Sequence, residues 1–270
     1  MLKLADTHCH TNYSHDSKAD FDEMIESAIE KGLASITITD HCDTEVNHEV
    51  EIPKSVASYI RAERAKKKYA DKIKVLSGAE ICYADGYGDY GKELESYCDF
   101  DEVIYSVHCL PLNGVITPYS QVDFSVFSQK QIDDYLMTYY ETVERSLDMN
   151  GDILPHLNCP YRYIKYKHGK TINESLYEPI IKRILEKAAK KNIALEINTS
   201  GSDSEVGVQP DWWMVEYYLN CGGKMLTLGG DAHIKENIAK NFDKVVEKLK
   251  SLGVSSVYRF EKRKPVEIKL

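Results

Sequence analysis

Short apolar runs typical of buried strands alternate along this chain with segments of helical periodicity. In one cycle, Asp20 and Glu23 form the capping-box pattern that begins a helix, Gly32 ends the helix, and residues 35–39 form the next strand-like run. Seven such cycles follow one another with no linker, repeat array or low-complexity tract. Because strands joined through helices pair in parallel, the sequence predicts a closed α/β barrel formed by residues 1–270 as a single domain.

The predicted elements follow this alternation. Strands are expected at 2–5, 35–39, 73–76, 103–107, 153–154, 194–197 and 225–228, with a last segment of strand character at 255–260. Helices are expected at about 21–31, 54–70, 92–97, 129–148, 174–191, 211–220 and 236–252. We expect the long loops 109–128, 157–173 and 200–210 to determine specificity, because loops on a rigid barrel rim are free to vary.

Seven of the nine histidines and two acids lie near the ends of the apolar runs. They are His8, His10, His15, His41, His108, His156, His233, Glu80 and Asp231. Side chains alternate along a strand, so His8 and His10 point the same way and Cys9 points away. Imidazole is the commonest side-chain metal ligand, and the carboxyl ends of barrel strands converge on one rim. The sequence therefore predicts a metal site at the C-terminal rim of the barrel.

Asp6 has the same strand parity as His8 and His10. It lies either one layer below them, where its carboxylate would accept the free ring N–H of a ligand histidine, or against a helix or solvent. The adjacent Gly229 and Gly230, which follow the seventh apolar run, indicate that the backbone there passes close to another part of the molecule.

Composition limits the class of protein and of substrate. The formal net charge of −9 argues against a groove for long nucleic acid and favours a small substrate. No apolar stretch approaches the ~18 residues of a membrane span, and the first apolar run is too short for a signal peptide, so we expect a cytoplasmic protein. The seven cysteines include no CxxC pair, which favours a reduced compartment over a disulfide framework. The sequence does not indicate an oligomeric state.

The segments around the predicted ligands resemble the motifs of the PHP (polymerase and histidinol phosphatase) family over essentially the whole chain. The matching segments are Asp6-Thr7-His8-Cys9-His10-Thr11 with His15, Thr39-Asp40-His41, Gly78-Ala79-Glu80, Ser106-Val107-His108, Pro155-His156 and Gly230-Asp231-Ala232-His233. The resemblance implies a distorted (β/α)7 TIM-like barrel with three divalent transition metals, of zinc, iron or manganese type. It implies one metal bound by His8, His10, Glu80 and Asp231, a second by His108 and His156 with Glu80 bridging, and a third by His15, His41 and His233.

Among the branches of the family, the chain looks most like the stand-alone histidinol-phosphate phosphatases. The suggestive segments are Ser106-Val107-His108-Cys109-Leu110, Pro160-Tyr161-Arg162-Tyr163, Asn198-Thr199-Ser200-Gly201 and Tyr258-Arg259-Phe260 with Lys262-Arg263-Lys264-Pro265. The expected reaction is hydrolysis of L-histidinol phosphate, a small phosphate monoester, by a hydroxide that bridges two metals. The alternative is a PHP phosphoesterase for nucleotides, sugar phosphates or phosphotyrosine, while a proofreading exonuclease or a non-catalytic metal module fits less well.

Roles in catalysis and substrate binding are expected for residues beside the ligand motifs. Arg162 is the only arginine in a predicted rim loop near a ligand, and its planar fork suits bidentate phosphate binding. Candidates for the proton donor to the leaving alkoxide are a metal-held water, Asp40 beside His41, and a protonated His168. The predicted catalytic residues are Asp40, His41 and Arg162. Candidate acceptors for the ammonium and imidazole of the substrate are Asp16, Asp43, Glu45, Asp203 and Asn198.

Overall fold

The computed structural model describes residues 3–84 and 90–270, without the side chains of residues 44–46. Within these residues the main sheet is parallel and has eight strands, in the order β1, β2, β4, β5, β8, β9, β10, with β3 paired to β4. Their bounds are β1 Ala5–Asp6, β2 Ser35–Ile38, β3 His41–Cys42, β4 Lys74–Cys82, β5 Glu102–Ser106, β8 Ile153–Leu154, β9 Ala194–Asn198 and β10 Leu226–Gly229.

Backbone pairing also joins the two ends of this sheet. The amide of Thr7, just after β1, donates to the carbonyl of Leu228 in β10 over 3.0 Å, and Cys9 forms a parallel bridge with Ala232. At another point of the ring, β5 and β8 share a single residue pair. The strands therefore form a nearly closed, distorted barrel, and the predicted fold class is confirmed.

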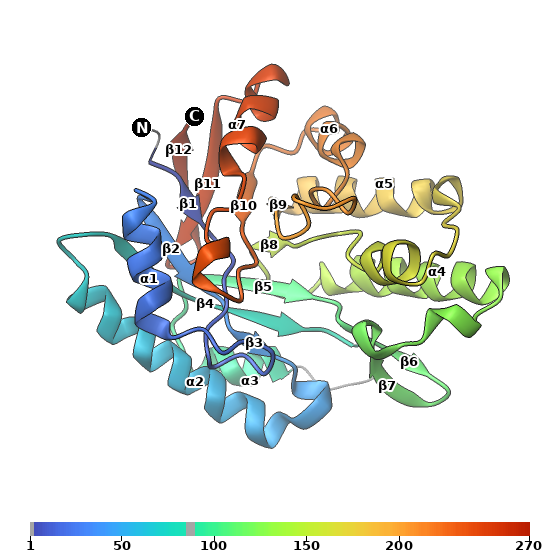
Figure 1. Ribbon diagram of the computed structural model, residues 1–270, viewed down its shortest axis with the longest axis horizontal. Coiled ribbons are helices and arrows are strands. Elements are labelled where there is room, and N and C mark those ends of the chain that lie inside the picture. The colour runs from blue at the N-terminus through green and yellow to red at the C-terminus, as the bar shows by residue number, and fades with distance from the viewer. Residues whose placement is uncertain (1–2, 85–89) are drawn as a thin grey trace.

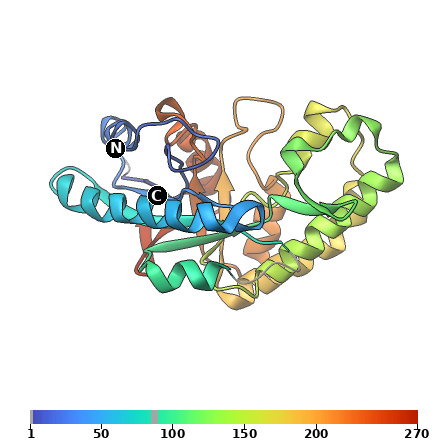
Figure 2. The ribbon, with the colours of Figure 1, turned by 90° about the horizontal axis from the view of Figure 1, so that it is seen from below.

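Seven α-helices of the described residues surround the barrel (Figure 1). Their bounds are α1 Phe21–Glu30, α2 Thr44–Lys68, α3 Tyr90–Tyr97, α4 Gln129–Ser146, α5 Glu174–Lys191, α6 Trp212–Asn220 and α7 Phe242–Ser251. Figures 1 and 2 both show α1 and α2 on one side of the molecule and α4 and α5 on the other. None of the helices in the described ranges is long and apolar enough to cross a membrane.

Helix α1 shows how the sequence fixes the barrel wall near the rim. The Asp20 side chain caps it by accepting the amides of Asp22 and Glu23, which no turn of the helix satisfies. Its apolar stripe, which includes Met24 and Ile25, packs against β2. Burying each such side chain contributes about 1.5–3 kcal/mol, so this packing holds β2 and the loop after β1 in place.

Some elements differ from the sequence prediction. Strand β4 runs on to Cys82, so Glu80 lies inside a strand rather than past the end of the predicted 73–76. Helix α2 begins at Thr44 rather than near residue 54, with non-helical backbone at Asn47. The helix expected from residue 236 is a 3₁₀ turn, Lys235–Asn237, followed by α7.

Further elements lie where no regular structure was expected. Strands β6 (Cys109–Leu112) and β7 (Val115–Pro118) form an antiparallel hairpin within the long loop after β5. A π-helix, Arg162–Lys167, follows β8. The last predicted strand, β11 (Ser256–Glu261), pairs with a further strand, β12 (Lys264–Lys269). The β6–β7 hairpin and the π-helix contribute walls to the cavity described next.

Candidate active site

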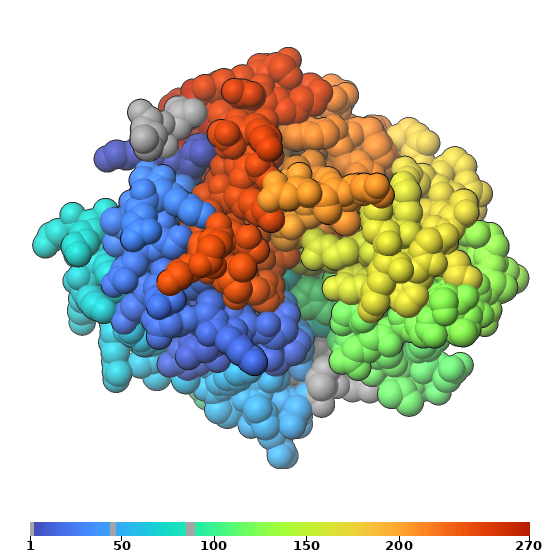
Figure 3. Space-filling view, in the orientation of Figure 1, coloured from blue at the N-terminus to red at the C-terminus, as the bar shows by residue number. Residues whose placement is uncertain are grey.

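The carboxyl ends of the barrel strands open into a cavity of about 310 Å³. The space-filling view shows the surface hollowed between the blue N-terminal segments and the green and yellow segments that follow β5 and β8 (Figure 3). The lining side chains are His15, Asp16, His41, Asp43, Glu51, Glu80, His108, Pro118, Tyr119, Ser120, Gln121, His156, Cys159, Arg162, Tyr163, Asp231 and His233. Seven of the nine predicted ligand positions are among them, and the other two, His8 and His10, are fully buried next to Glu80.

The carboxylate of Glu80 lies among four of the histidines. Its Oε2 is 3.2 Å from His8 Nε2 and 3.0 Å from His41 Nδ1. Its Oε1 is 3.1 Å from His108 Nε2 and 2.8 Å from His156 Nε2. Burial alone would raise the pKa of Glu80, but the surrounding imidazoles hold it well below its ordinary value. Glu80 is therefore an ionised carboxylate in contact with predicted ligands from four other segments of the chain.

His10 links this centre to the opposite part of the rim. Its Nε2 lies 3.2 Å from Asp231 Oδ1, and its ring stacks on His41 and His233 at centroid distances of 4.3 and 4.2 Å. Burial, together with His233 and His41, holds the pKa of His10 well below its ordinary value. The ring is therefore neutral, which is the form that binds metals.

Several buried atoms at this centre lie at ion-pair distances from one another or from Asp231, but none of them forms a hydrogen bond of normal geometry among the described residues. They are His8 Nε2, His10 Nε2, His41 Nδ1 and Glu80 Oε2. A buried polar atom without a partner costs about 1–3 kcal/mol, so a group of such atoms at one point indicates a bound cation. Imidazole nitrogens and carboxylate oxygens suit zinc and other divalent transition metals. The residues present therefore fit a metal centre.

Four overlapping groups of side chains bring their donor atoms within 4.8 Å of one another in the described ranges. These groups are His8, His10 and Asp231; His8, Glu80 and His156; His10, His41 and His233; and His41, Asp43 and His108. The first three overlap the three ligand sets expected from the sequence. His15, a member of the third expected set, is absent from these groups, and its side chain is 52% exposed.

The orientation of His8 is set by Glu196 of β9, which the sequence analysis did not single out. His8 Nδ1 is 2.6 Å from Glu196 Oε1, and both groups are fully buried. The other oxygen of Glu196 accepts the His156 amide and the Asn198 side-chain amide. A carboxylate at Nδ1 keeps the proton there and leaves the lone pair of Nε2 to face the centre.

Asp6 does not orient His8, so that alternative was wrong. Its carboxylate accepts the backbone amides of Gly230 and Ala239, each over 2.8 Å, and more weakly that of His8. The prediction about the two glycines is confirmed. A Cβ on Gly230 would lie 2.5 Å from Asp6 Oδ2, and one on Gly229 would overlap Glu196 Oε1.

Asp40, a predicted catalytic residue, is buried and does not line the cavity. Its carboxylate accepts hydrogen bonds from the Thr11 amide, the Thr11 hydroxyl, Ser14 Oγ and Ser58 Oγ, at 2.6–2.8 Å. Ser14 Oγ donates to Asp40, so it accepts the Nδ1 proton of His10 at 3.0 Å. Asp40 thus holds the loop after β1 and supports His10, and the structure gives it no position for proton transfer.

Two of the predicted substrate acceptors line the cavity but face histidines. Asp16 Oδ2 lies 3.1 Å from His233 Nε2, and Asp43 Oδ1 lies 3.4 Å from His108 Nδ1. Asp43 Oδ2 is also 3.6 Å from His15 Nδ1. Both carboxylates are therefore engaged with the histidine cluster.

Two other predicted acceptors are not brought to the cavity. Asn198 is buried behind the site, where its amide lies 3.3 Å from Asp231 Oδ2. Asp203 is on the surface, paired with Lys240 Nζ at 2.9 Å and with Asn241. The structure therefore gives no support to Asp203 as a substrate acceptor, and Asn198 contacts a predicted ligand instead. The side chain of Glu45 lies outside the described residues.

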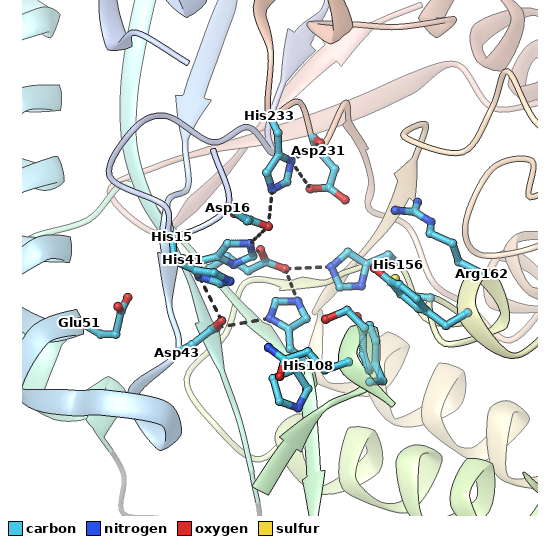
Figure 4. Close-up of a pocket in the computed structure, with 17 residues that line it drawn as sticks. His15, Asp16, His41, Asp43, Glu51, His108, His156, Arg162, Asp231 and His233 are labelled. Carbon is cyan, nitrogen blue, oxygen red and sulfur yellow. Dashed lines mark hydrogen bonds and ion pairs between the residues drawn. The ribbon is translucent and has the colours of Figure 1, made fainter. Parts of the chain in front are cut away.

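Arg162, the first residue of the π-helix, lines the cavity as expected. Its Nη2 donates to Ser200 Oγ over 2.6 Å and to Gln209 Oε1 over 3.1 Å. His168, at the other end of the same segment, does not line the cavity and lies 3.5 Å from Asp123. Roles were expected for both Arg162 and His168, but of the two only Arg162 faces the histidine cluster (Figure 4).

Several lining residues were assigned no individual role from the sequence. They include Glu51 in α2, Tyr119 and Gln121 after β7, and Cys159 and Tyr163 after β8. All except Glu51 lie in the loops 109–128 and 157–173 that were expected to determine specificity. Which side chains of these loops face the cavity depends on the β6–β7 hairpin and the π-helix, so it follows from tertiary structure.

Residues 6–200 match the PHP domain family, which is more than half of the chain. The chain belongs to the PHP family. This match spans the predicted ligand motifs from His8 to His156, and Asp231 and His233 lie beyond it.

Several known proteins resemble the chain over nearly its whole length. A Thermotoga maritima protein named "Probable histidinol-phosphatase" is 29% identical, with 93% of each chain covered. The histidinol-phosphatase of Lactococcus lactis is 27% identical, covering 96% of this chain and 95% of the relative. The crystal structure of the Lactococcus lactis histidinol phosphate phosphatase, complexed with zinc, L-histidinol and phosphate, superposes with a TM-score of 0.81 at 25% identity, covering 98% of this chain and 100% of the other.

Proposed function

We propose that this protein hydrolyses L-histidinol phosphate to L-histidinol and inorganic phosphate. The observation that carries the proposal is the similarity, over 98% of the chain, to a phosphatase crystallised with zinc, L-histidinol and phosphate. The site of this chain supports it, because the predicted ligand positions surround one cavity of a size suited to a small molecule.

The proposal includes three divalent transition metals, of zinc, iron or manganese type. His8, His10, Glu80 and Asp231 would hold one metal; His108, His156 and Glu80 a second; and His15, His41 and His233 a third. When bound, such metals neutralise phosphate oxygens and make water a stronger acid. The relative with zinc supports the metal class, and the unpartnered donor atoms of His8, His10, His41 and Glu80 support the location.

The proposed roles of the protein side chains follow from their positions. Glu196 and Ser14 hold the rings of His8 and His10 by their Nδ1 atoms, so that both Nε2 atoms face Glu80 and Asp231. Arg162 would bind the phosphate group, because Ser200 and Gln209 fix its guanidinium at the cavity wall. Asp40 and His168 are not proton donors in this proposal, because neither lines the cavity.

One preparation tests the proposal by metal analysis and by phosphate release from a set of monoesters. We expect kcat/KM for histidinol phosphate to exceed that for an uncharged alkyl phosphate by roughly 10²-fold or more, because acceptors for the substrate nitrogens would otherwise stay unpaired. A nucleotide, a sugar phosphate and phosphotyrosine complete the set. Equal turnover of the charged and uncharged esters would overturn the histidinol assignment, and faster turnover of another ester would favour the general phosphoesterase.

A further inference from the structure

The carboxylates that line the cavity differ in whether a histidine faces them. Asp16, Asp43, Glu80 and Asp231 each have an oxygen within 3.4 Å of a ring nitrogen. The fifth, Glu51, makes neither an ion pair nor a hydrogen bond within the described ranges of the chain. Among the described acids that line the cavity, Glu51 alone has no close contact with a ring nitrogen of the histidine cluster.

Glu51 is nevertheless almost fully enclosed. The residue is 8% exposed, and its Oε2 is buried with no hydrogen-bond partner in the described structure. Burial raises the pKa of this carboxyl, and the nearby charges of Lys54, His15 and His41 offset only part of that rise. A buried acceptor on a cavity wall gains free energy when a ligand brings the missing donor.

The positions of Glu51 and Arg162 indicate how an elongated ligand would be oriented in the cavity. In Figure 4, Glu51 and Arg162 lie on opposite sides of the histidine cluster. Arg162 is the one arginine or lysine among the described lining residues. An elongated ligand with an anionic end near Arg162 and the cluster could therefore direct a cationic end toward Glu51.

We propose that Glu51 is the specificity-determining acceptor for a positively charged nitrogen group of the substrate. This inference rests on the proposed function, since it concerns the end of the phosphate monoester remote from the cluster. Asp16 and Asp43 also line the cavity, but they face His233 and His108. Asp203 points to the surface. Among the described carboxylates that line the cavity, Glu51 is therefore the one available to a ligand.

The test compares wild type with Glu51→Gln, which keeps the size of the side chain and removes its charge. The substrates are histidinol phosphate, O-phosphoethanolamine, which has an ammonium but no imidazole, and propyl phosphate, which has neither. We expect the ratio of kcat/KM for histidinol phosphate to that for propyl phosphate to fall by roughly 10- to 100-fold, mainly through KM, since a charge-assisted hydrogen bond to the bound substrate is lost. Glu49→Gln is the matched control, because Glu49 is an exposed carboxylate of the same helix and does not line the cavity.

The other measurements separate the outcomes. A parallel fall for O-phosphoethanolamine identifies the ammonium as the partner of Glu51, and a fall for histidinol phosphate alone identifies the imidazole. An unchanged ratio, with normal metal content and thermal unfolding, overturns the role of Glu51 and leaves the proposed function standing. Wild type that does not prefer histidinol phosphate overturns the proposed function itself. Product inhibition gives a second measurement: the Ki of L-histidinol should rise in Glu51→Gln, while that of inorganic phosphate should not.

Discussion

Replacing Arg162 by lysine tests how the cavity holds a phosphate group. In the described structure the hydrogen bonds of Arg162 use Nη2 alone, which donates to Ser200 and Gln209. Nε and Nη1 therefore keep their N–H groups for a ligand, and the guanidinium is already oriented. A lysine ammonium has three donors at one point, so it cannot hold both anchors and also offer further N–H groups in fixed positions to phosphate.

The expected loss follows from the bonds that lysine cannot replace. The positive charge stays in place, so the loss is that of one charge-assisted hydrogen bond together with the orientation given by the two anchors. A charge-assisted bond contributes about 1.5–3 kcal/mol, which corresponds to a roughly 10- to 150-fold decrease in kcat/KM. Ser200→Ala removes one neutral anchor and should cost less, about 0.5–1.5 kcal/mol.

Steady-state phosphate release from histidinol phosphate and from propyl phosphate measures these losses. Both esters should lose activity to a similar degree, because the phosphate is the part they share. Arg183→Lys is a matched control: Arg183 pairs with Glu144 on the surface, far from the lining residues, and its replacement should change kcat/KM less than about twofold. Unchanged kinetics in Arg162→Lys would refute phosphate binding by this residue, and a loss for histidinol phosphate alone would assign it to the tail of the substrate.

Two further substitutions test the centre and its support. Glu80→Ala should abolish hydrolysis and lower the metal content by about two equivalents, because Glu80 is the proposed bridge between two metal positions. Full metal content by elemental analysis would contradict the bridging role. Asp40→Ala should lower the free energy of unfolding of the metal-stripped protein by about 2–4 kcal/mol, because four hydrogen bonds to the carboxylate are lost. Denaturant titrations measure this loss. Normal stability with greatly reduced kcat would instead support a role of Asp40 in proton transfer.

The parallel barrel and the convergence of the ligand candidates could be predicted because both depend on local patterns. The side chains of His8 and His10 share a face through strand alternation, and barrel topology brings strand ends together whatever their separation in sequence. Glu80 shows the limit of this reasoning. The apolar run at 73–76 indicated a shorter strand, but β4 continues through Gly78, where Thr37 and Thr39 pack so closely that a Cβ would lie about 3 Å from them.

The β6–β7 hairpin was missed although its turn is visible in the sequence. Asn113 and Gly114 have φ values of 53° and 79°, and Asn-Gly is the pair that two-residue hairpin turns favour. Glu196 was missed for a different reason. It lies within the apolar strand 194–197, and only the register with neighbouring strands shows that its carboxylate meets His8.

Asp203 was expected to line the site and does not. Closeness in sequence to a rim motif does not fix the direction of a loop side chain, and Lys240 draws this carboxylate to the surface. His8 and His10 have directions set by strand alternation, so their shared face could be predicted from the sequence. Glu51 lies on α2, whose orientation over the cavity depends on packing against β4 and on the break in the helix at Asn47. Changes in substrate preference with retained metal binding should therefore arise in α2 and in residues 118–121, because these lining segments carry none of the ligand positions.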